Sequence, residues 1–290
     1  MKFNFKERKL MSFIALSSTL AFCASCGSST KDQANYLVIG TDCDYVPFSW
    51  NASKESEYTY KIDGTMEFAD GYDIQIAKQI AKKMNKELKV KRILFDSLLI
   101  ELQQGNIDLA FGGLIATEDR LKVVDFSIPY YNSEYACLIK KSSLPNSNFG
   151  TKDNKVKYED FLEFINGKSM VAQAGTQQDD FIDKYFSCVK HDNPLSSYSL
   201  CALDVQNGAS FACLSEVPVC EQLVKKYSDL TVIYMDQSFL SDEDKGKCCS
   251  YVGVNKNNTQ LKDEVNTILC TYSNDDFNKI MEEVEERVEI

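Results

Sequence analysis

The chain has 290 residues, 11 cysteines and a formal net charge of −11 at pH 7. An acidic chain lacks the basic face that neutralises phosphate groups, so we expect no nucleic-acid partner. The length allows a large buried core and suits two lobes better than one.

The N-terminal segment has the pattern of an export signal. Lysine and arginine are concentrated before residue 10, an apolar run follows, and small residues close the segment. This order predicts a secretory signal peptide over residues 1–25. The peptide ASCG is similar to a bacterial lipoprotein processing site, although Cys23 stands where leucine is usual. We therefore expect lipidation at Cys26 and a lipidated tether over residues 26–35, which attaches the protein to a membrane.

The cysteines leave two interpretations open. Apart from Cys23 and Cys26 they number nine, so at least one thiol stays unpaired if the others form disulfides. Alternatively, they are small buried apolar residues of a protein from a reducing environment. Their spacing contains neither a CxxC pair nor a Cys/His motif, and we expect no metal site.

Strand-like apolar runs alternate with helical periodicity in the first half of the chain. This alternation predicts an α/β architecture with mostly parallel sheets. The expected elements are a strand over residues 36–42, a polar segment with several tyrosines over 51–70, a helix over 76–84, a strand over 87–95, a helix through Leu98 and Leu102 that stops at Gly105, and a strand over 106–113.

The stretch GGLIATEDRLKVVDFSIPYY, residues 112–131, follows the last of these strands and leads into a helix. Glycines let backbone N–H groups approach an anion, and a guanidinium binds a carboxylate through two parallel hydrogen bonds. The glycines and Arg120 therefore indicate a carboxylate receptor at the carboxyl end of a strand, where ligands bind in open α/β sheets. The alternative is that Arg120 is a solvated helix residue.

A polar stretch over residues 140–155 separates the first run of elements from a second run of the same kind. The two runs predict lobe 1 over residues 36–138 and 252–290 and lobe 2 over 139–251, with two chain crossings that form a hinge. The second run is expected to contain helices over 158–167, 176–186 and 217–227, strands over 168–175, 209–215, 231–235 and 249–258, and closing helices over 259–272 and 275–289.

Five stretches together resemble the bacterial extracellular solute-binding protein family 3: VIGTDCDYVPFSW, GYDIQIAKQIAKKM, LLIELQQGNIDLAFGGLIATEDRLKVVDFSIPYY, VAQAGTQQDDF and SEVPV. The match covers roughly residues 36–290. The resemblance implies the two-lobed periplasmic-binding-protein fold of type II, the flytrap fold, with mixed, mostly parallel sheets and a two-strand hinge. It also implies a monomer without cofactor that binds a free amino acid and serves the permease of an ABC transporter on the periplasmic or extracellular face.

The resemblance also assigns residues to the two charged ends of an amino acid. Arg120 is expected to bind the α-carboxylate, with help from Thr117 and, across the cleft, from the turn of Gly175, Thr176 and Gln177, which opens a helix. Glu216 is expected to accept the amine. The resemblance gives the family's usual aspartate at this position, and the alternative is a solvated acid at a helix start.

Further residues are implied around these two ends. The backbone carbonyl of Gly113 is expected as a second amine acceptor, whereas Ile115 stands where the family often has a hydroxyl. Tyr45 and Phe95 are expected to offer ring faces to the ligand, with ordinary core packing as the alternative. Asp42 and Gln173 are expected to contact the ligand side chain, and the acid favours a basic or amide side chain over an acidic one.

Two rival functions are considered. The same fold has relatives that act as cyclohexadienyl dehydratases, in which a cleft acid, here Glu216, removes water from a cyclic carboxylate substrate. A sensor lobe of a signalling receptor is disfavoured, because the chain ends after its last two helices. His191 is the only histidine, and no nucleophile partner for it is identifiable from the sequence, so a triad is not expected. We expect a binding protein rather than an enzyme.

Overall fold

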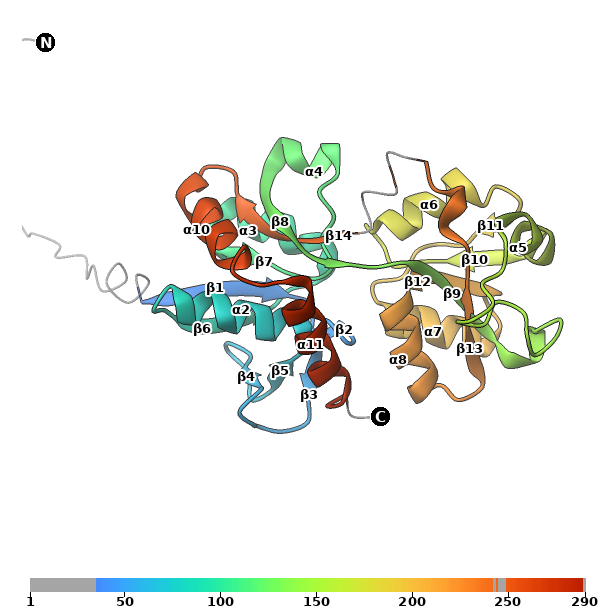
Figure 1. Cartoon of the computed structure of the whole chain (residues 1–290), viewed down its shortest axis with the longest axis horizontal. Helices are drawn as coiled ribbons and strands as arrows, with labels where there is room; N and C mark the ends of the chain where they lie inside the picture. Colours follow the sequence, from blue (N-terminus) through green and yellow to red (C-terminus); the bar gives the residue numbers. More distant parts are fainter. Residues whose placement is uncertain (1–34, 242–243, 245–248, 289–290) are drawn as a thin grey trace, which may run out of the picture. The chain divides into compact units, whose positions relative to one another are not determined.

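The computed structural model describes residues 35–241, 244 and 249–288. The predicted signal peptide, the lipidation site Cys26 and Cys248 lie outside these residues. Two five-stranded sheets with helices on both faces make up most of the described chain (Figure 1). We call the unit around the first sheet lobe 1 and the unit around the second sheet lobe 2.

The first sheet combines parallel and antiparallel pairing. Its strand order is β6-β1-β7-β14-β8, in which β6, β1 and β7 are parallel, β14 runs antiparallel to β7, and β8 runs antiparallel to β14. The late strand β14 thus returns to lobe 1 after the chain has passed through lobe 2. The strands are β1 (Tyr36–Thr41), β6 (Glu87–Arg92), β7 (Leu109–Ala110), β8 (Val124–Asn132) and β14 (Cys249–Asn255).

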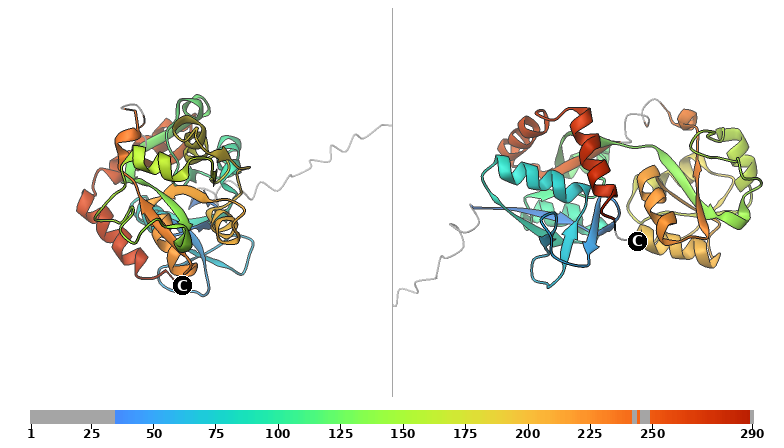
Figure 2. Two further views of the ribbon diagram at one scale, coloured as in Figure 1. Left: turned by 90° about the vertical axis from the view of Figure 1, so that its right-hand side faces the viewer. Right: turned by 60° about the horizontal axis from the view of Figure 1, so that its bottom comes forward.

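Alternation along β1 explains the layers of lobe 1. Leu37 and Ile39 are fully buried and belong to the cluster that contains the apolar face of α2, whereas Val38 packs into a separate cluster with α3 on the opposite face. The C-terminal helices α10 and α11 contact α2 and so return the end of the chain to lobe 1 (Figures 1 and 2). The helices are α2 (Tyr72–Lys83), α3 (Leu98–Gln104), α4 (Glu118–Val123), α10 (Thr259–Leu269) and α11 (Asn274–Glu285), with the 3₁₀ turn η1 (Phe95–Ser97).

The second sheet has the same plan, with the order β11-β10-β12-β9-β13. Its parallel strands are β11, β10 and β12, and β9 runs antiparallel to both β12 and β13. Helices α7 and α8 supply buried residues on one face, and α5 and α6 supply them on the other. The elements are β9 (Tyr135–Lys140), η2 (Lys141–Ser143), α5 (Tyr158–Ile165), β10 (Ser169–Val171), α6 (Gln177–Tyr185), β11 (Lys190–His191), α7 (Tyr198–Asn207), β12 (Ala212–Glu216), α8 (Val217–Lys226), β13 (Leu230–Tyr234) and η3 (Gln237–Phe239).

The polar segment over residues 51–70 forms much of a third, smaller sheet. Its order is β2-β3-β5-β4, and its strands are β2 (Asp44–Tyr45), β3 (Ser49–Ala52), β4 (Tyr60–Lys61) and β5 (Phe68–Asp70). Trp50 is buried within this sheet. The segment therefore contributes packing to lobe 1.

The chain passes between the two sheets where β8 ends and β9 begins. β8 ends at Asn132 and β9 begins at Tyr135, so two residues make this first crossing. We propose that the lobes divide close to this point and again just before β14, near the boundaries that the sequence predicts. The eight cysteines in the described part of the chain are all free, and five of them are buried, as expected for small apolar residues.

Candidate functional site

A cavity lies between the two lobes. Nine of the twelve residues predicted to bind ligand line its wall, and they come from both lobes. Because parallel strands of each sheet end here, the loops that carry these residues converge on one site. The residues that line the cavity are Tyr45, Phe95, Gly112, Gly113, Ile115 and Arg120 from lobe 1, and Gln173, Thr176, Gln177, Gln178, Tyr198 and Glu216 from lobe 2.

Arg120 reaches across the cavity. Helix α4 begins after Thr117, whose hydroxyl accepts a hydrogen bond from the backbone N–H of Arg120 at 3.3 Å. The guanidinium donates from Nη1 to the carbonyl of Ile115 at 3.1 Å and from Nη2 to the carbonyl of Gly175 at 2.8 Å. A guanidinium has five N–H donors, so others stay available for an anion. Arg120 is therefore anchored in the cavity wall and is not a solvated helix residue.

The amino terminus of α6 forms the facing wall. Thr176 caps this helix: its hydroxyl accepts from the N–H of Asp179 at 3.3 Å and donates to the carbonyl of Gln173 at 2.7 Å. The first N–H groups of a helix have no partner within the helix, and the dipole makes this end positive. Together with Arg120, this helix end makes one side of the cavity suited to a carboxylate.

Glu216 supplies the opposite charge. It ends β12 and is only 5% exposed. Its Oε1 accepts from Nε2 of Gln178 at 3.2 Å, whereas its Oε2 has no hydrogen-bond partner among the described residues. Burial raises the pKa of Glu216 to about 7, against the lowering effect of Tyr45 and Gln178. The carboxylate does not cap α8, so the structure does not support a solvated acid at a helix start.

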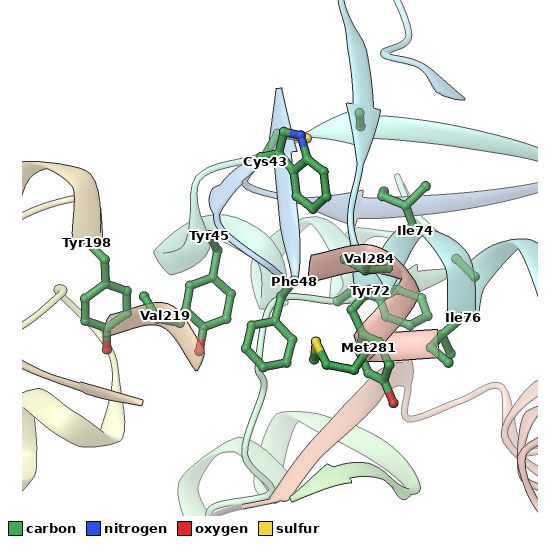
Figure 3. Close-up of a cluster of buried hydrophobic side chains, with 14 of the residues drawn as sticks. Cys43, Tyr45, Phe48, Tyr72, Ile74, Ile76, Tyr198, Val219, Met281 and Val284 are labelled. Atoms are coloured by element: carbon green, nitrogen blue, oxygen red, sulfur yellow. The ribbon is translucent and has the colours of Figure 1, made fainter. Parts of the chain in front are cut away.

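Tyr45 packs directly against the glycine loop. A Cβ placed on Gly113 would lie 2.8 Å from Cε1 of Tyr45, and the φ of Gly113 is +64°, so glycine permits this close approach. The ring of Tyr45 stacks on Phe48 at 4.8 Å and on Tyr198 at 5.7 Å between centroids (Figure 3). Phe95 faces the guanidinium of Arg120, with 5.5 Å between the ring centroid and Cζ.

Asp42, Thr117 and Gly175 are the three predicted residues that do not line the cavity, although the carbonyl of Gly175 accepts from Arg120. Asp42 is 8% exposed, and its Oδ1 accepts from the N–H of Asp44 at 3.2 Å and from Oγ of Ser49 at 3.3 Å. Burial raises the pKa of Asp42 to about 6, whereas a hydrogen bond from Gln173 lowers it. Asp42 is therefore buried beside Gln173, which lines the cavity, and does not line it itself.

Three residues of the cavity wall were missing from the sequence prediction: Gly112, Gln178 and Tyr198. Gln178 follows directly on two predicted residues, and Gly112 belongs to the motif quoted for Arg120. Tyr198 begins α7, in a stretch to which no element was assigned. The sequence does contain a helix-start signal there, because serine is a preferred capping residue. In the structure Ser197 caps α7 and accepts a hydrogen bond from the N–H of Leu200 at 3.3 Å.

The described part of the chain contains no cluster of three or more histidine, cysteine and acidic residues that could hold a metal ion. His191 contacts Asp179 through Nε2 at 2.8 Å and Asp183 through Nδ1 at 3.0 Å, and it does not line the cavity. The cavity itself offers charged and hydrogen-bonding groups at two separate ends. This arrangement suits a small zwitterion.

Comparison with protein families supports this interpretation. The model of the bacterial extracellular solute-binding proteins, family 3, matches residues 37–284. The chain belongs to this family. The family expected from the motifs is confirmed, and its members are described as extracellular solute-binding proteins.

Relatives within family 3 cover different parts of the chain. The arginine-binding extracellular protein ArtP of Bacillus subtilis is 29% identical over 176 residues, which are 60% of this chain and 58% of that protein. The arginine-binding periplasmic protein of Mannheimia haemolytica is 32% identical over 165 residues, which are 56% of this chain and 60% of that protein. The chain thus matches about three fifths of the length of each of these relatives.

A solved structure extends the likeness to the whole fold. The crystal structure of the substrate binding protein of an amino acid ABC transporter is 30% identical, covers 87% of this chain and 100% of that chain, and superposes with a TM-score of 0.67. The two-lobed α/β fold with mixed sheets is thereby confirmed. Among the described residues of this family 3 protein, no helix is both long and apolar enough to cross a membrane.

Proposed function

We propose that this protein is the substrate-binding component of an ABC importer, which captures a free amino acid between its lobes and delivers it to a membrane permease. The observation that carries the proposal is the polarity of one cavity. Arg120 and the amino terminus of α6 suit a carboxylate, and Glu216 suits an ammonium group. An amino acid is a small ligand that brings both charges.

Charge on the remaining wall supports a ligand with a basic or amide side chain. Two relatives are described as arginine-binding. In this chain, the carboxylate of Asp42 lies next to Gln173 in the wall, and Arg120 is the one cationic side chain that lines the cavity as the structure describes it. A zwitterion uses the charges of Arg120 and Glu216, so Asp42 is left to balance a positive side chain.

Contacts across the cavity support capture by closure of the lobes. The guanidinium of Arg120 joins Gly175, and Oγ of Ser199 donates to Oδ1 of Asp44 at 2.7 Å. Both bonds connect lobe 1 with lobe 2. A carboxylate between Arg120 and α6 would add donors from both lobes to one anion, which stabilises the closed arrangement.

A thermal-shift screen tests the proposal. The chain from Gly27 onward is unfolded and refolded to remove bound ligand, and its melting temperature is measured with each of the twenty L-amino acids and with cystine. A ligand at a thousandfold its Kd stabilises a protein by about 4 kcal/mol, which is a large shift. We expect stabilisation by a basic or amide amino acid. No shift with any of them would contradict the proposal.

The charge of Asp42 gives a test of side-chain preference. At pH 7.5 Asp42 is mostly ionised, because its pKa is about 6. Asp42→Asn is therefore expected to weaken a ligand with a cationic side chain about tenfold, or about 1.4 kcal/mol, and to change glutamine binding by less than about threefold. Calorimetric titration at pH 7.5 measures both. The exposed Asp153→Asn provides the control for net charge, and an equal loss for both ligands in Asp42→Asn would contradict the assignment.

One observation keeps the dehydratase as a second candidate. Glu216 is a buried acid with a pKa of about 7, which is suitable for general acid catalysis. The enzyme would convert arogenate or prephenate into aromatic products at many turnovers per protein molecule. A binding protein would bind one ligand per site without turnover, so product analysis separates the two functions.

We also propose that the mature chain is a monomer held at the cell envelope by acyl chains on Cys26. The support is the predicted signal over residues 1–25 and the extracellular character of the family. Several acyl chains on one cysteine would give stable membrane attachment.

A further inference from the structure

Two polar atoms without partners lie in the wall of the same cavity. Among the described residues, four buried side-chain atoms lack a hydrogen-bond partner, and two of these, the hydroxyl of Tyr198 and Oε2 of Glu216, belong to residues that line the cavity. A buried polar group without a partner costs about 1–3 kcal/mol, and most such groups have one. Glu216 has a proposed role toward the amine, whereas the hydroxyl of Tyr198 has none.

The position of Tyr198 is fixed by packing. Its side chain is 2% exposed, and its ring stacks on Tyr45 across the cavity at 5.7 Å with 27° between the planes. Figure 3 shows the two rings side by side, with their hydroxyls pointing the same way. Tyr198 stands at the start of α7, directly after the capping residue Ser197. This packing fixes the direction of the hydroxyl, although the hydroxyl has no hydrogen-bond partner among the described residues.

The polar neighbours of this hydroxyl belong to both ends of the proposed ligand site. Burial raises the pKa of Tyr198 well above its usual range, and the charges of Cys213 and Glu216 act in the same direction. The nearby hydroxyl of Thr176 acts against them, although it makes no hydrogen bond of normal geometry with the hydroxyl of Tyr198. Thr176 lies at the carboxylate end of the site, and Glu216 lies at the amine end. Tyr198, Thr176 and Glu216 all line the cavity, so Tyr198 stands in the wall that joins its two charged ends.

We infer that Tyr198 is a ligand-binding residue whose hydroxyl contacts the amino and carboxylate head group of the bound amino acid from lobe 2. The inference rests on the proposed function and deepens it. A phenolic hydroxyl has one donor and free acceptor capacity, so it can donate to a carboxylate and accept from an ammonium group. Because the head group is common to all amino acids, Tyr198 contributes affinity and does not select among side chains.

The inference predicts effects of opposite sign for Tyr198→Phe. The phenyl ring keeps the stacking on Tyr45 and removes a hydroxyl that has no partner in the protein, so the ligand-free protein is expected to melt at the same temperature or higher. Binding is expected to weaken at least about tenfold, since a hydrogen bond to a charged group is lost. The factor is expected to be the same for every amino acid that the wild type binds.

The matched control is Tyr72→Phe. Tyr72 is fully buried and does not line the cavity, and its hydroxyl donates to the carbonyl of Tyr130 at 2.8 Å. Removal of this satisfied hydrogen bond is expected to lower the melting temperature and to leave the Kd unchanged. Both variants and the wild type are measured by differential scanning calorimetry without ligand and by calorimetric titration with each amino acid that stabilises the wild type.

Each outcome decides the inference. An unchanged Kd in Tyr198→Phe overturns it, and so does a loss confined to ligands with one kind of side chain. A lower melting temperature together with an unchanged Kd assigns Tyr198 to packing alone. A uniform loss of affinity without loss of stability supports the head-group contact. If the wild type binds no amino acid, the proposed function itself fails, and this result is visible before any variant is compared.

Discussion

Replacement of Arg120 by alanine is expected to abolish binding of the amino acid and to leave the fold intact. The guanidinium supplies the charged donors for the carboxylate and also joins the lobes through Gly175. Loss of a two-pronged ionic contact is expected to raise the Kd at least about a hundredfold, which corresponds to about 2.8 kcal/mol. Calorimetric titration measures the Kd, and circular dichroism with a melting curve verifies folding.

A control for Arg120→Ala is available in the same lobe. Arg92 pairs with Glu67 at 2.6 Å, and both side chains are well exposed outside the cavity. Arg92→Ala removes the same charge outside the cavity, so the affinity of this variant should equal that of the wild type. Because exposed ion pairs contribute little to stability, the variant should also fold normally. Equal affinities of the Arg120→Ala and Arg92→Ala proteins would show that Arg120 does not bind the ligand.

Glu216→Gln is expected to weaken binding at least about tenfold at pH 8, or about 1.4 kcal/mol, because an amide cannot balance the ammonium charge. The same change is expected to raise the melting temperature of the ligand-free protein at pH 8. A neutral amide replaces a buried carboxylate whose charged form is disfavoured by burial.

The pKa of Glu216 also determines how pH acts on the protein. Its folded value of about 7 is above the ordinary value of 4.5, so its contribution to stability is present below pH 4.5 and is lost as pH rises through 7. Binding has the opposite trend, because the ammonium group requires the ionised acid. The affinity of the wild type is expected to fall about tenfold between its plateau above pH 8 and pH 6.

Comparison of variants isolates the contribution of Glu216 to this pH dependence. Asp42 also titrates near this range, with a pKa of about 6, and it is present in all the proteins compared. Titrations at pH 6, 7 and 8 should give a smaller change in Kd for Glu216→Gln than for the wild type. Glu221→Gln, a change outside the cavity, should keep the wild-type profile. Identical profiles in all three proteins would refute the role of Glu216.

Elements with strong local signals were predictable from the sequence. The apolar run of β1 corresponds to a central strand buried on both faces. Helix α3 ends at Gly105 as expected, because that glycine adopts a left-handed conformation with φ of 74° as its cap. Both cases depend on short-range chemistry, in which neighbouring residues alone determine the local structure.

Elements whose stability comes from distant partners were not predictable. The strands of the third sheet are two to four residues long and mostly polar, and they exist because β3 and β5 pair across intervening residues. Several strands are also shorter than expected: β7 covers only Leu109–Ala110, because the chain turns at Gly112 with φ of 135°. The periodicity of apolar residues in the sequence predicts that such a strand exists but does not predict its length.

The candidate site divides in the same way. Arg120 and Glu216 were found through motifs that the chain keeps in order, and the cavity brings them together. Tyr198 has no motif, and its place in the wall follows from stacking on Tyr45, a residue more than 150 positions earlier. Burial of Asp42 beside Gln173 is likewise a product of the tertiary structure. Motifs therefore locate the charged groups, and packing decides which neutral groups join them.

The close approach of Tyr45 to Gly113 makes these two positions dependent on each other. Any side chain at 113 would meet the tyrosine ring, and the positive φ of this residue strains a side chain whatever the space, so a smaller residue at 45 removes only one of two obstacles. The free-energy changes of substitutions at 45 and at 113 are not expected to add, because a smaller residue at 45 removes the clash that a side chain at 113 would meet. During sequence divergence glycine is therefore expected to persist at 113, and adaptation of this pocket to a bulkier ligand would have to begin at Tyr45.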